Sequence, residues 1–300
     1  MIIPDYLQKN DTVAIAAPAR KISRPEIAPA EELLRHAGFN VYYDERLFAE
    51  DNQFAGNDEV RAAYFQDLLN NPKVKAIWCA RGGYGSVRII DKLDFSTFVK
   101  NPKWICGYSD VTVFHSHINK NFNIATLHAT MPINVHENQY DTEANRTFIA
   151  ALKGEKLRYE LPAHPFNRSV DVCAPVIGGN ISMLYSLLGS PSDVDTAGKI
   201  LFMEDLDEYL YHIDRMMANI ERNGKFQNLA ALVVGHLSDM HDNTIPFGRT
   251  AEEIVAEHAA KYDFPLFFNF PAGHLSDNRA IRMGCEMRLF CQDNKIIVEN

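Results

Sequence analysis

The strongest constraint on the fold is the alternation of short apolar runs with amphipathic segments in the first half of the chain. Apolar runs occupy residues 12–17, 39–43, 74–79 and 103–107, and segments with helical spacing occupy 26–36, 57–69 and 84–93. Continuous apolar runs are typical of strands buried on both faces of a parallel sheet. Strands that alternate with helices predict an open, mostly parallel α/β sheet with helices on both sides.

This rhythm is lost between residues 151 and 175, where short polar pieces contain three prolines. We therefore predict an N-terminal α/β domain at 1–155, a linker at about 156–169 and a C-terminal domain at 170–300. The C-terminal part is predicted to be mixed α/β. Its expected strands are 199–203, 229–235 and 265–270, its helices are 181–188, 209–223 and 250–262, and its hairpin pairs 287–291 with 296–299.

Charge and composition exclude several classes of protein. The formal net charge is −9, from 30 Lys and Arg against 39 Asp and Glu, which argues against nucleic acid as a partner. No apolar run approaches the roughly 18 residues that a membrane helix needs, so no membrane partner is expected. Five scattered cysteines without CxxC spacing favour buried thiols in a reducing cytoplasm over disulfides or structural zinc.

One serine stands where a strand is expected to turn abruptly. The run 103–107 leads into GYSDV at residues 107–111, and a helix follows. Gly-x-Ser at a strand-to-helix turn resembles a nucleophile elbow, although Val111 replaces the final glycine of the usual motif. Such a turn presents the Ser109 hydroxyl at the carboxyl edge of the sheet, beside the free N–H groups of a helix N-terminus. The alternative is that Ser109 is an ordinary helix N-cap.

A glycine-rich turn, RGGYGS at residues 81–86, follows the run 74–79. Its spacing fits neither common phosphate-binding motif. Glycine lets the main chain approach a reacting carbonyl closely, so an oxyanion donor is one interpretation of this turn. A simple tight turn is the other.

A serine nucleophile needs a base and an acid that orients it. Among eleven histidines, His274 follows the run 265–270 in a polar loop, which is where a base would lie in such a sheet. Glu204 is the first residue after the strand 199–203, within a group of four acids that would usually form a solvated loop. A metal cluster of His236, Asp239, His241 and Asp242 has no diagnostic spacing.

Taken in order, these pieces resemble the LD-carboxypeptidase family of serine peptidases, which also contains the microcin C self-immunity peptidase. The resemblance rests on AIAAPA, ARGGYGSVRII, GYSDVT, GGNISMLYSLLGSP, FMEDLDEYLYHIDRMM and FPAGHLSDN, which together run through nearly the whole chain. It implies a flavodoxin-like N-terminal domain that carries the serine elbow and a C-terminal domain that supplies Glu and His.

The resemblance also implies the roles of individual residues. Ser109 would be the nucleophile, His274 the base and Glu204 the acid, and the backbone N–H groups of Gly83 and Asp110 would form the oxyanion hole, with Gly82 as an alternative donor. No metal and no organic cofactor is implied. Arg81 and Asn180 are candidates for substrate binding, and Arg279 and Arg282 are further candidates for binding a carboxylate.

The implied substrate is a small peptide, the cytoplasmic murein tetrapeptide L-Ala-γ-D-Glu-diamino acid-D-Ala, from which the terminal D-Ala is removed in cell-wall recycling. The alternatives are a microcin-type peptidase that cleaves adenylate-like amides and an inactive binding relative. A glutamine-amidotransferase-like enzyme would need cysteine at position 109, and Cys106 lies three residues too early. The family is often dimeric, so a homodimer is a further expectation.

Overall fold

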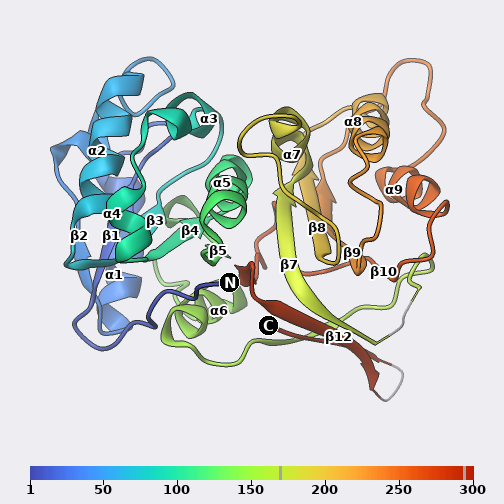
Figure 1. Ribbon diagram of the computed structural model, residues 1–300. Helices are drawn as coiled ribbons and strands as arrows, with labels where there is room; N and C mark the ends of the chain where they lie inside the picture. The colour runs from blue at the N-terminus through green and yellow to red at the C-terminus, as the bar shows by residue number, and fades with distance from the viewer. Residues whose placement is uncertain (169–170, 293–294) are drawn as a thin grey trace.

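Two β-sheets flanked by helices make up the protein (Figure 1). The computed structural model describes residues 1–168, 171–292 and 295–300. The N-terminal sheet has the strand order β11-β5-β4-β3-β1-β2, and the C-terminal sheet has the order β10-β9-β8-β7-β12-β13-β6. The α/β class predicted from the alternation of strands and helices is therefore confirmed.

The N-terminal sheet is parallel except at one edge. Its parallel strands are β1 (Thr12–Ala16), β2 (Asn40–Tyr42), β3 (Val74–Cys79), β4 (Trp104–Gly107) and β5 (Thr126–His128). Val13, Ile77 and Ile105 are fully buried, because helices cover both faces of these strands. Complete burial explains why the strands read as continuous apolar runs.

The helices of this half are α1 (Arg24–His36), α2 (Asp58–Asn70), α3 (Ser86–Ile89), α4 (Ser96–Lys100), α5 (Thr112–Phe122) and α6 (Glu143–Lys153). Two of them begin with side-chain caps. Ser23 and Glu26 form a capping box at α1, and the Asn57 side chain accepts a hydrogen bond from the Val60 N–H at α2. The predicted helix 84–93 is shorter than expected, because it passes into a 3₁₀ turn after Ile89.

In the C-terminal sheet, β7 (Val172–Asn180), β8 (Ile200–Leu206), β9 (Ala231–Ser238) and β10 (Leu266–Phe267) are parallel, whereas β12 (Glu286–Gln292), β13 (Lys295–Glu299) and β6 (Arg158–Leu161) pair antiparallel. The predicted hairpin is therefore confirmed as β12 and β13. The expected strand 265–270 is shorter, since only two of its residues pair with β9.

The helices of this half are α7 (Ile181–Leu187), α8 (Leu210–Arg222) and α9 (Ala251–Ala259). The helix predicted at 209–223 is confirmed as α8, and its apolar residues Ile213 and Met217 are fully buried. Among the described residues, no helix has the length and apolar character to span a membrane. Cys79 and Cys106 are buried as expected, but Cys173 and Cys291 are exposed, because they lie in the antiparallel pairs of β7 with β12 and of β12 with β13, where one face meets solvent.

Two edge strands do not follow the division predicted from the sequence. β6 falls inside the expected linker 156–169 and pairs with β13. In the other direction, β11 (Ile281–Met283) leaves the C-terminal half and pairs antiparallel with β5 of the N-terminal sheet. The division at 156–169 remains a prediction, and the crossing segment 271–283 ties the two sheets together.

Arg282 secures this crossing. Its side chain is buried, and its guanidinium donates to the carbonyl oxygens of Ala151 (3.1 Å), Glu155 (2.6 Å) and Asn300 (3.0 Å). One cation thereby connects β11 to the end of α6, to the start of the expected linker and to the last residue of the chain. Hydrogen bonds to a charged group contribute roughly 1.5–3 kcal/mol each.

We predict that Arg282→Met lowers the free energy of unfolding by about 3 kcal/mol, since buried carbonyl oxygens lose their charged donor. Urea unfolding followed by circular dichroism measures the effect. The exposed Arg222 at the end of α8 provides the matched control, and Arg222→Met is expected to change stability by about 0.5 kcal/mol at most. Equal midpoints for the two variants would contradict this role of Arg282.

Candidate active site

Ser109 lies directly after β4 in a strained turn. Its φ is +62°, in the left-handed region that residues other than glycine seldom adopt, and Gly107 before it has a φ of +150°. A 3₁₀ turn, Ser109–Val111, then leads into α5. Tyr108 and Val111 are the cap residues of these two elements, so Ser109 is not the N-cap of either. Strain of this kind is characteristic of functional sites and agrees with the predicted elbow.

The glycine turn after β3 packs against this elbow. A Cβ atom at Gly82 would lie 3.1 Å from Ser109 Cβ and 3.2 Å from Ser109 Oγ. Gly83 has a φ of +105°, and a Cβ there would lie 2.1 Å from Arg20 Cδ. The two glycines are thus required for different reasons: Gly82 lets the main chain approach the serine, and Gly83 adopts a backbone conformation that other residues avoid.

Two buried charged groups hold this turn in place. The Asp110 carboxylate accepts a hydrogen bond from the Ser86 N–H (2.9 Å), and burial raises the pKa of Asp110. On the other side, the buried Arg61 guanidinium donates to the carbonyl oxygens of Gly85 (3.0 Å) and Pro18 (2.6 Å). The Ser86 N–H already donates to a carboxylate, so it is not free to bind a phosphate. This arrangement disfavours the phosphate-binding interpretation of the turn.

His274 and Glu204 form a hydrogen-bonded pair. His274 Nδ1 lies 2.7 Å from Glu204 Oε2, and the Glu204 side chain is completely buried near the end of β8. Since a carboxylate can only accept, Nδ1 carries the proton, and this hydrogen bond leaves Nε2 as the proton acceptor of the neutral ring. Burial lowers the pKa of His274, but the hydrogen bond to Glu204 and its negative charge outweigh burial, and the net effect raises that pKa.

Two further glycines make room for this pair. A Cβ at Gly273 would lie 2.9 Å from Glu204 Cβ, and one at Gly235 would lie 3.2 Å from Glu204 Cβ and 2.4 Å from the Ala272 carbonyl oxygen. The backbone therefore closes around the glutamate on both sides. Sequence reasoning did not identify these two residues, although their positions beside the expected strand ends were a usable signal.

The histidine lies beside the serine elbow. The ring of Tyr108, the residue before Ser109, is centred 4.9 Å from the His274 ring. These groups come from β4, β8 and the crossing segment 271–283, which belong to different sheets. The structure thus brings Ser109, Glu204 and His274, with the Gly82–Gly83 turn, to one junction.

Asn180 also lies at this junction, on the C-terminal side. It caps α7 and accepts a hydrogen bond from the Met183 N–H, and its amide donates to Asp205 Oδ1 (2.8 Å). Its own N–H donates to Thr112 Oγ1 (3.0 Å) at the start of α5, a contact that sequence reasoning missed. The substrate-binding role of Asn180 remains a prediction.

The acidic group Glu204–Glu208 differs from the solvated loop expected of such a sequence. Glu204 and Asp205 are both buried at the end of β8. Burial and the neighbouring Glu204 raise the pKa of Asp205 to about 6, although Asn180 and Ser182 donate to its carboxylate. Asp207 is exposed and accepts from His241. Within the described ranges, no group of three or more His, Cys, Asp or Glu side chains could hold a metal ion.

The arginines proposed from sequence already have partners within the protein. Arg81 lies 3.5 Å from Glu26, Arg279 pairs with Asp277, and Arg282 binds main-chain carbonyls. Arg282 is therefore structural, and this corrects its candidacy for carboxylate binding. The role of Arg81 remains a prediction.

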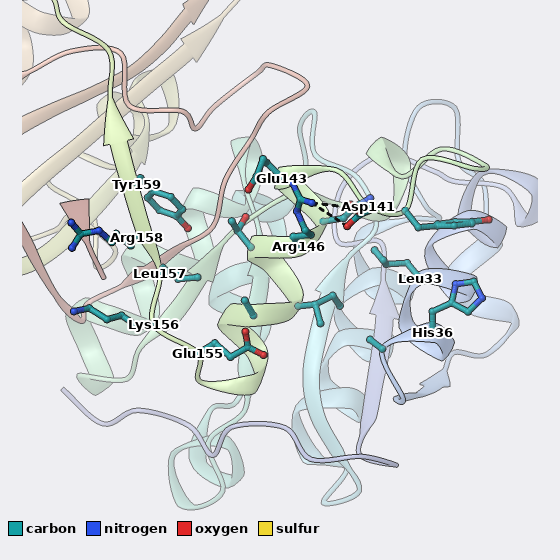
Figure 2. Close-up of a pocket in the computed structure, with 16 residues that line it drawn as sticks. Leu33, His36, Asp141, Glu143, Arg146, Glu155, Lys156, Leu157, Arg158 and Tyr159 are labelled. Atoms are coloured by element: carbon teal, nitrogen blue, oxygen red, sulfur yellow. Dashed lines mark hydrogen bonds and ion pairs between the residues drawn. The ribbon is translucent and has the colours of Figure 1, made fainter. Parts of the chain in front are cut away.

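A pocket of about 520 Å³ lies elsewhere, between α1, α6 and β6 (Figure 2). Leu33, Arg146, Glu155 and Tyr159 are among the side chains that line it. None of the site residues predicted from sequence belongs to this lining. The pocket is thus separate from the junction that holds Ser109 and His274.

Both halves of the chain match the domains of one protein family. Residues 13–129 match the LD-carboxypeptidase N-terminal domain, and residues 174–289 match the LD-carboxypeptidase C-terminal domain. A relative from Bacillus subtilis (strain 168), named probable murein peptide carboxypeptidase, is 30% identical over 99% of this chain and 94% of its own length.

Solved structures share the whole fold. The muramoyltetrapeptide carboxypeptidase from Oxalobacter formigenes has a TM-score of 0.86 at 27% identity, over 96% of this chain and 98% of that one. The wild-type apo form of the microcin C7 self-immunity protein MccF has a TM-score of 0.87 at 21% identity, over 100% and 99%, and at this identity the likeness shows the fold alone. With both family domains matched in order across most of the chain, this protein belongs to the LD-carboxypeptidase family and is a serine-type carboxypeptidase.

Proposed function

We propose that this protein removes the terminal D-Ala from the murein tetrapeptide L-Ala-γ-D-Glu-diamino acid-D-Ala, in the cytoplasmic recycling of cell-wall peptides. The observation that carries the proposal is the buried Glu204–His274 pair beside the strained turn at Ser109. The choice of substrate is supported by relatives named for murein peptides and for muramoyltetrapeptide.

In the proposed reaction, His274 Nε2 takes the Ser109 hydroxyl proton as the oxygen attacks the carbonyl carbon before D-Ala. Glu204 keeps the proton on Nδ1 and stabilises the imidazolium that forms. His274 then gives the proton to the leaving amine, and D-Ala departs. Water, activated by the same histidine, hydrolyses the acyl-serine and restores the enzyme.

The developing oxyanion would be stabilised by the N–H groups of Asp110 and of Gly83 or Gly82. Asp110 follows the nucleophile directly, and a Cβ at Gly82 would lie 3.5 Å from the Asp110 nitrogen, so the two segments carrying these donors are in contact. The Asp110–Ser86 and Arg61–Gly85 hydrogen bonds keep them in fixed relation before substrate arrives. Such preorganised donors are typically worth about 10²–10³ in rate.

The adenylate-amide alternative would use an aromatic side chain to stack on a nucleobase. Trp78 and Trp104 are fully buried in β3 and β4, so neither is available for that role. Because relatives are named for murein peptides, the murein peptide is the substrate to test first.

We predict that Ser109→Ala lowers release of D-Ala from L-Ala-γ-D-Glu-meso-diaminopimelate-D-Ala by about 10⁴-fold or more, because the nucleophile is lost. Mass spectrometry of the products measures the release. The peptide with L-Ala at the end is the stereochemical control and should stay uncleaved. Equal release by wild type and variant would show that Ser109 is not the nucleophile, and no release by folded wild type would refute the murein substrate.

The pH dependence of kcat/KM provides a second test. A base must be unprotonated to act, so activity should fall with decreasing pH through the raised pKa of His274, above the usual value of about 6.5. In Glu204→Gln the carboxylate that does most to raise this pKa is lost, and burial, opposed by the charge of Asp205, shifts the pKa downward. We expect the acidic limb of kcat/KM to move to lower pH while kcat falls by about 10²–10⁴.

The control for this profile is Glu257→Gln, which removes an exposed acid on α9 that pairs with Arg249 and not with His274. Its acidic limb should coincide with that of the wild type. An unchanged limb in Glu204→Gln would contradict the assignment of His274 as the base.

Gly82→Ala tests the close approach of the glycine turn. Gly82 is outside the left-handed region, so alanine fits its backbone, but the new methyl group would press on Ser109. We expect kcat to fall roughly tenfold, with little change in melting temperature. Gly189→Ala is the converse control, because Gly189 has a φ of +75° and open space around it. It should lower stability by about 1 kcal/mol and leave kcat unchanged; the reverse pattern would refute the role of Gly82.

A further inference from the structure

Arg20 lies across the glycine turn next to the serine. It follows β1 at the carboxyl edge of the N-terminal sheet, in the segment after Ala17. Its aliphatic stem crosses the Cα of Gly83, where a Cβ would lie 2.1 Å from Arg20 Cδ and 2.6 Å from Arg20 Cγ. Glycine at position 83 therefore makes room for this side chain, in addition to meeting the backbone requirement.

The order of the strands places Arg20 within reach of the reacting bond. β1, β3 and β4 are neighbours in the sheet, and adjacent strands are about 4.8 Å apart. The Arg20 stem spans from the end of β1 to the turn after β3, and Gly82 of that turn contacts Ser109 at the end of β4. Two successive glycines, Gly83 and Gly82, therefore separate the Arg20 stem from the nucleophile. A leaving residue that extends from Ser109 along this turn directs its carboxylate toward the Arg20 guanidinium.

The charge of Arg20 has no acidic partner in the described part of the chain, where no ion pair or side-chain hydrogen bond involves it. Its basic neighbours are engaged: Lys21 pairs with Glu50, Arg81 with Glu26 and Arg88 with Asp58. The Arg20 side chain is exposed, so its guanidinium can meet a ligand.

The opposite side of the junction carries the reverse charge. The acidic group Glu204–Glu208 lies at the end of β8, and His274 donates a hydrogen bond to one of its carboxylates, that of Glu204. A peptide carboxylate directed toward that group would meet like charge, whereas directed toward the β1 side it meets a guanidinium. A guanidinium offers two parallel N–H donors that match the two oxygens of a carboxylate.

We propose that Arg20 is a specificity-determining residue that binds the α-carboxylate of the substrate's C-terminal residue. This inference rests on the proposed function, since it assigns the leaving D-amino acid to the β1–β3 side of Ser109. Arg20 thereby makes the enzyme an exopeptidase: a peptide without a free terminal carboxylate lacks the group that the guanidinium recognises.

The test compares two substrates that differ only at the C-terminus, the tetrapeptide ending in D-Ala and the same peptide ending in D-alaninamide. We expect wild type to prefer the free acid. Arg20→Gln should lower kcat/KM for the acid by roughly 10- to 100-fold, and change kcat/KM for the amide by less than about threefold, so that the preference disappears. Arg20→Lys keeps the charge without the planar fork, and should retain part of the preference.

Lys21→Gln is the matched control, because it removes the same charge from the adjacent residue, whose ammonium already pairs with Glu50. Both substrates should react with this variant as they do with wild type. An equal loss on acid and amide in Arg20→Gln, or no loss on either with active wild type, would overturn the inference and leave the proposed function standing.

A binding experiment separates the two proposals when turnover fails. In the Ser109→Ala background, calorimetry measures the affinity for the acid and amide peptides with and without Arg20→Gln. Loss of an acid preference on Arg20→Gln supports the inference whatever the turnover of wild type. A preference that survives Arg20→Gln, or no preference in the parent, overturns it.

Discussion

The antiparallel pairing of β11 with β5 is the contact on which the site depends. It joins Ile281 to His128 and Met283 to Thr126, and so attaches the C-terminal chain to the edge of the N-terminal sheet. Asn278, just before β11, accepts hydrogen bonds from the Gly273 N–H (2.9 Å) and pairs with His128 Nε2 (3.3 Å). With both ends anchored, the segment between β10 and β11 has little freedom, and His274 is carried on it. The histidine therefore reaches the serine elbow because a strand from the C-terminal half joins the N-terminal sheet, not because of the loop sequence alone.

The same junction concentrates features that would destabilise an ordinary core. Glu204 and Asp205 are buried acids, and buried carboxylates require compensating hydrogen bonds. One Glu204 oxygen receives the His274 hydrogen bond, while the other, Oε1, has no partner among the described residues. Ser109 adds a left-handed backbone conformation. Such costs persist where the surrounding structure enforces them, here through Arg282, Arg61 and the glycines that admit close packing.

Charge is also distributed unevenly around Ser109. The acids at the end of β8 contribute to the net charge of −9, yet Arg20 and Arg81 lie on the opposite side, at the ends of β1 and β3. A substrate with a free carboxylate at one end is oriented by such an arrangement, since only one direction places opposite charges together. In the proposed reaction, the polarity of the junction matters more than the total charge of the chain for which end of a peptide can leave.

Much of the fold was predictable because burial on both faces leaves a strong sequence signal. The apolar runs at 74–79 and 103–107 became β3 and β4, the hairpin of β12 and β13 was expected, and the apolar face of α8 was identified. Ser109, Glu204 and His274 were singled out because each follows a strand at the carboxyl edge, and the family resemblance gave them roles. What the sequence by itself determined is thus the order of elements and the chemistry at their ends.

The tertiary structure decided which of these ends meet. β11 is short, contains a buried arginine and has no alternating pattern, so its pairing with a strand some 150 residues earlier left no local signal. The burial of Asp205, the contact of Gly82 with Ser109 and the absence of an acidic partner for Arg20 among the described residues are likewise relations between distant residues. Local propensity reports on neighbours in the chain, whereas a site at the junction of two sheets is made by contacts across space.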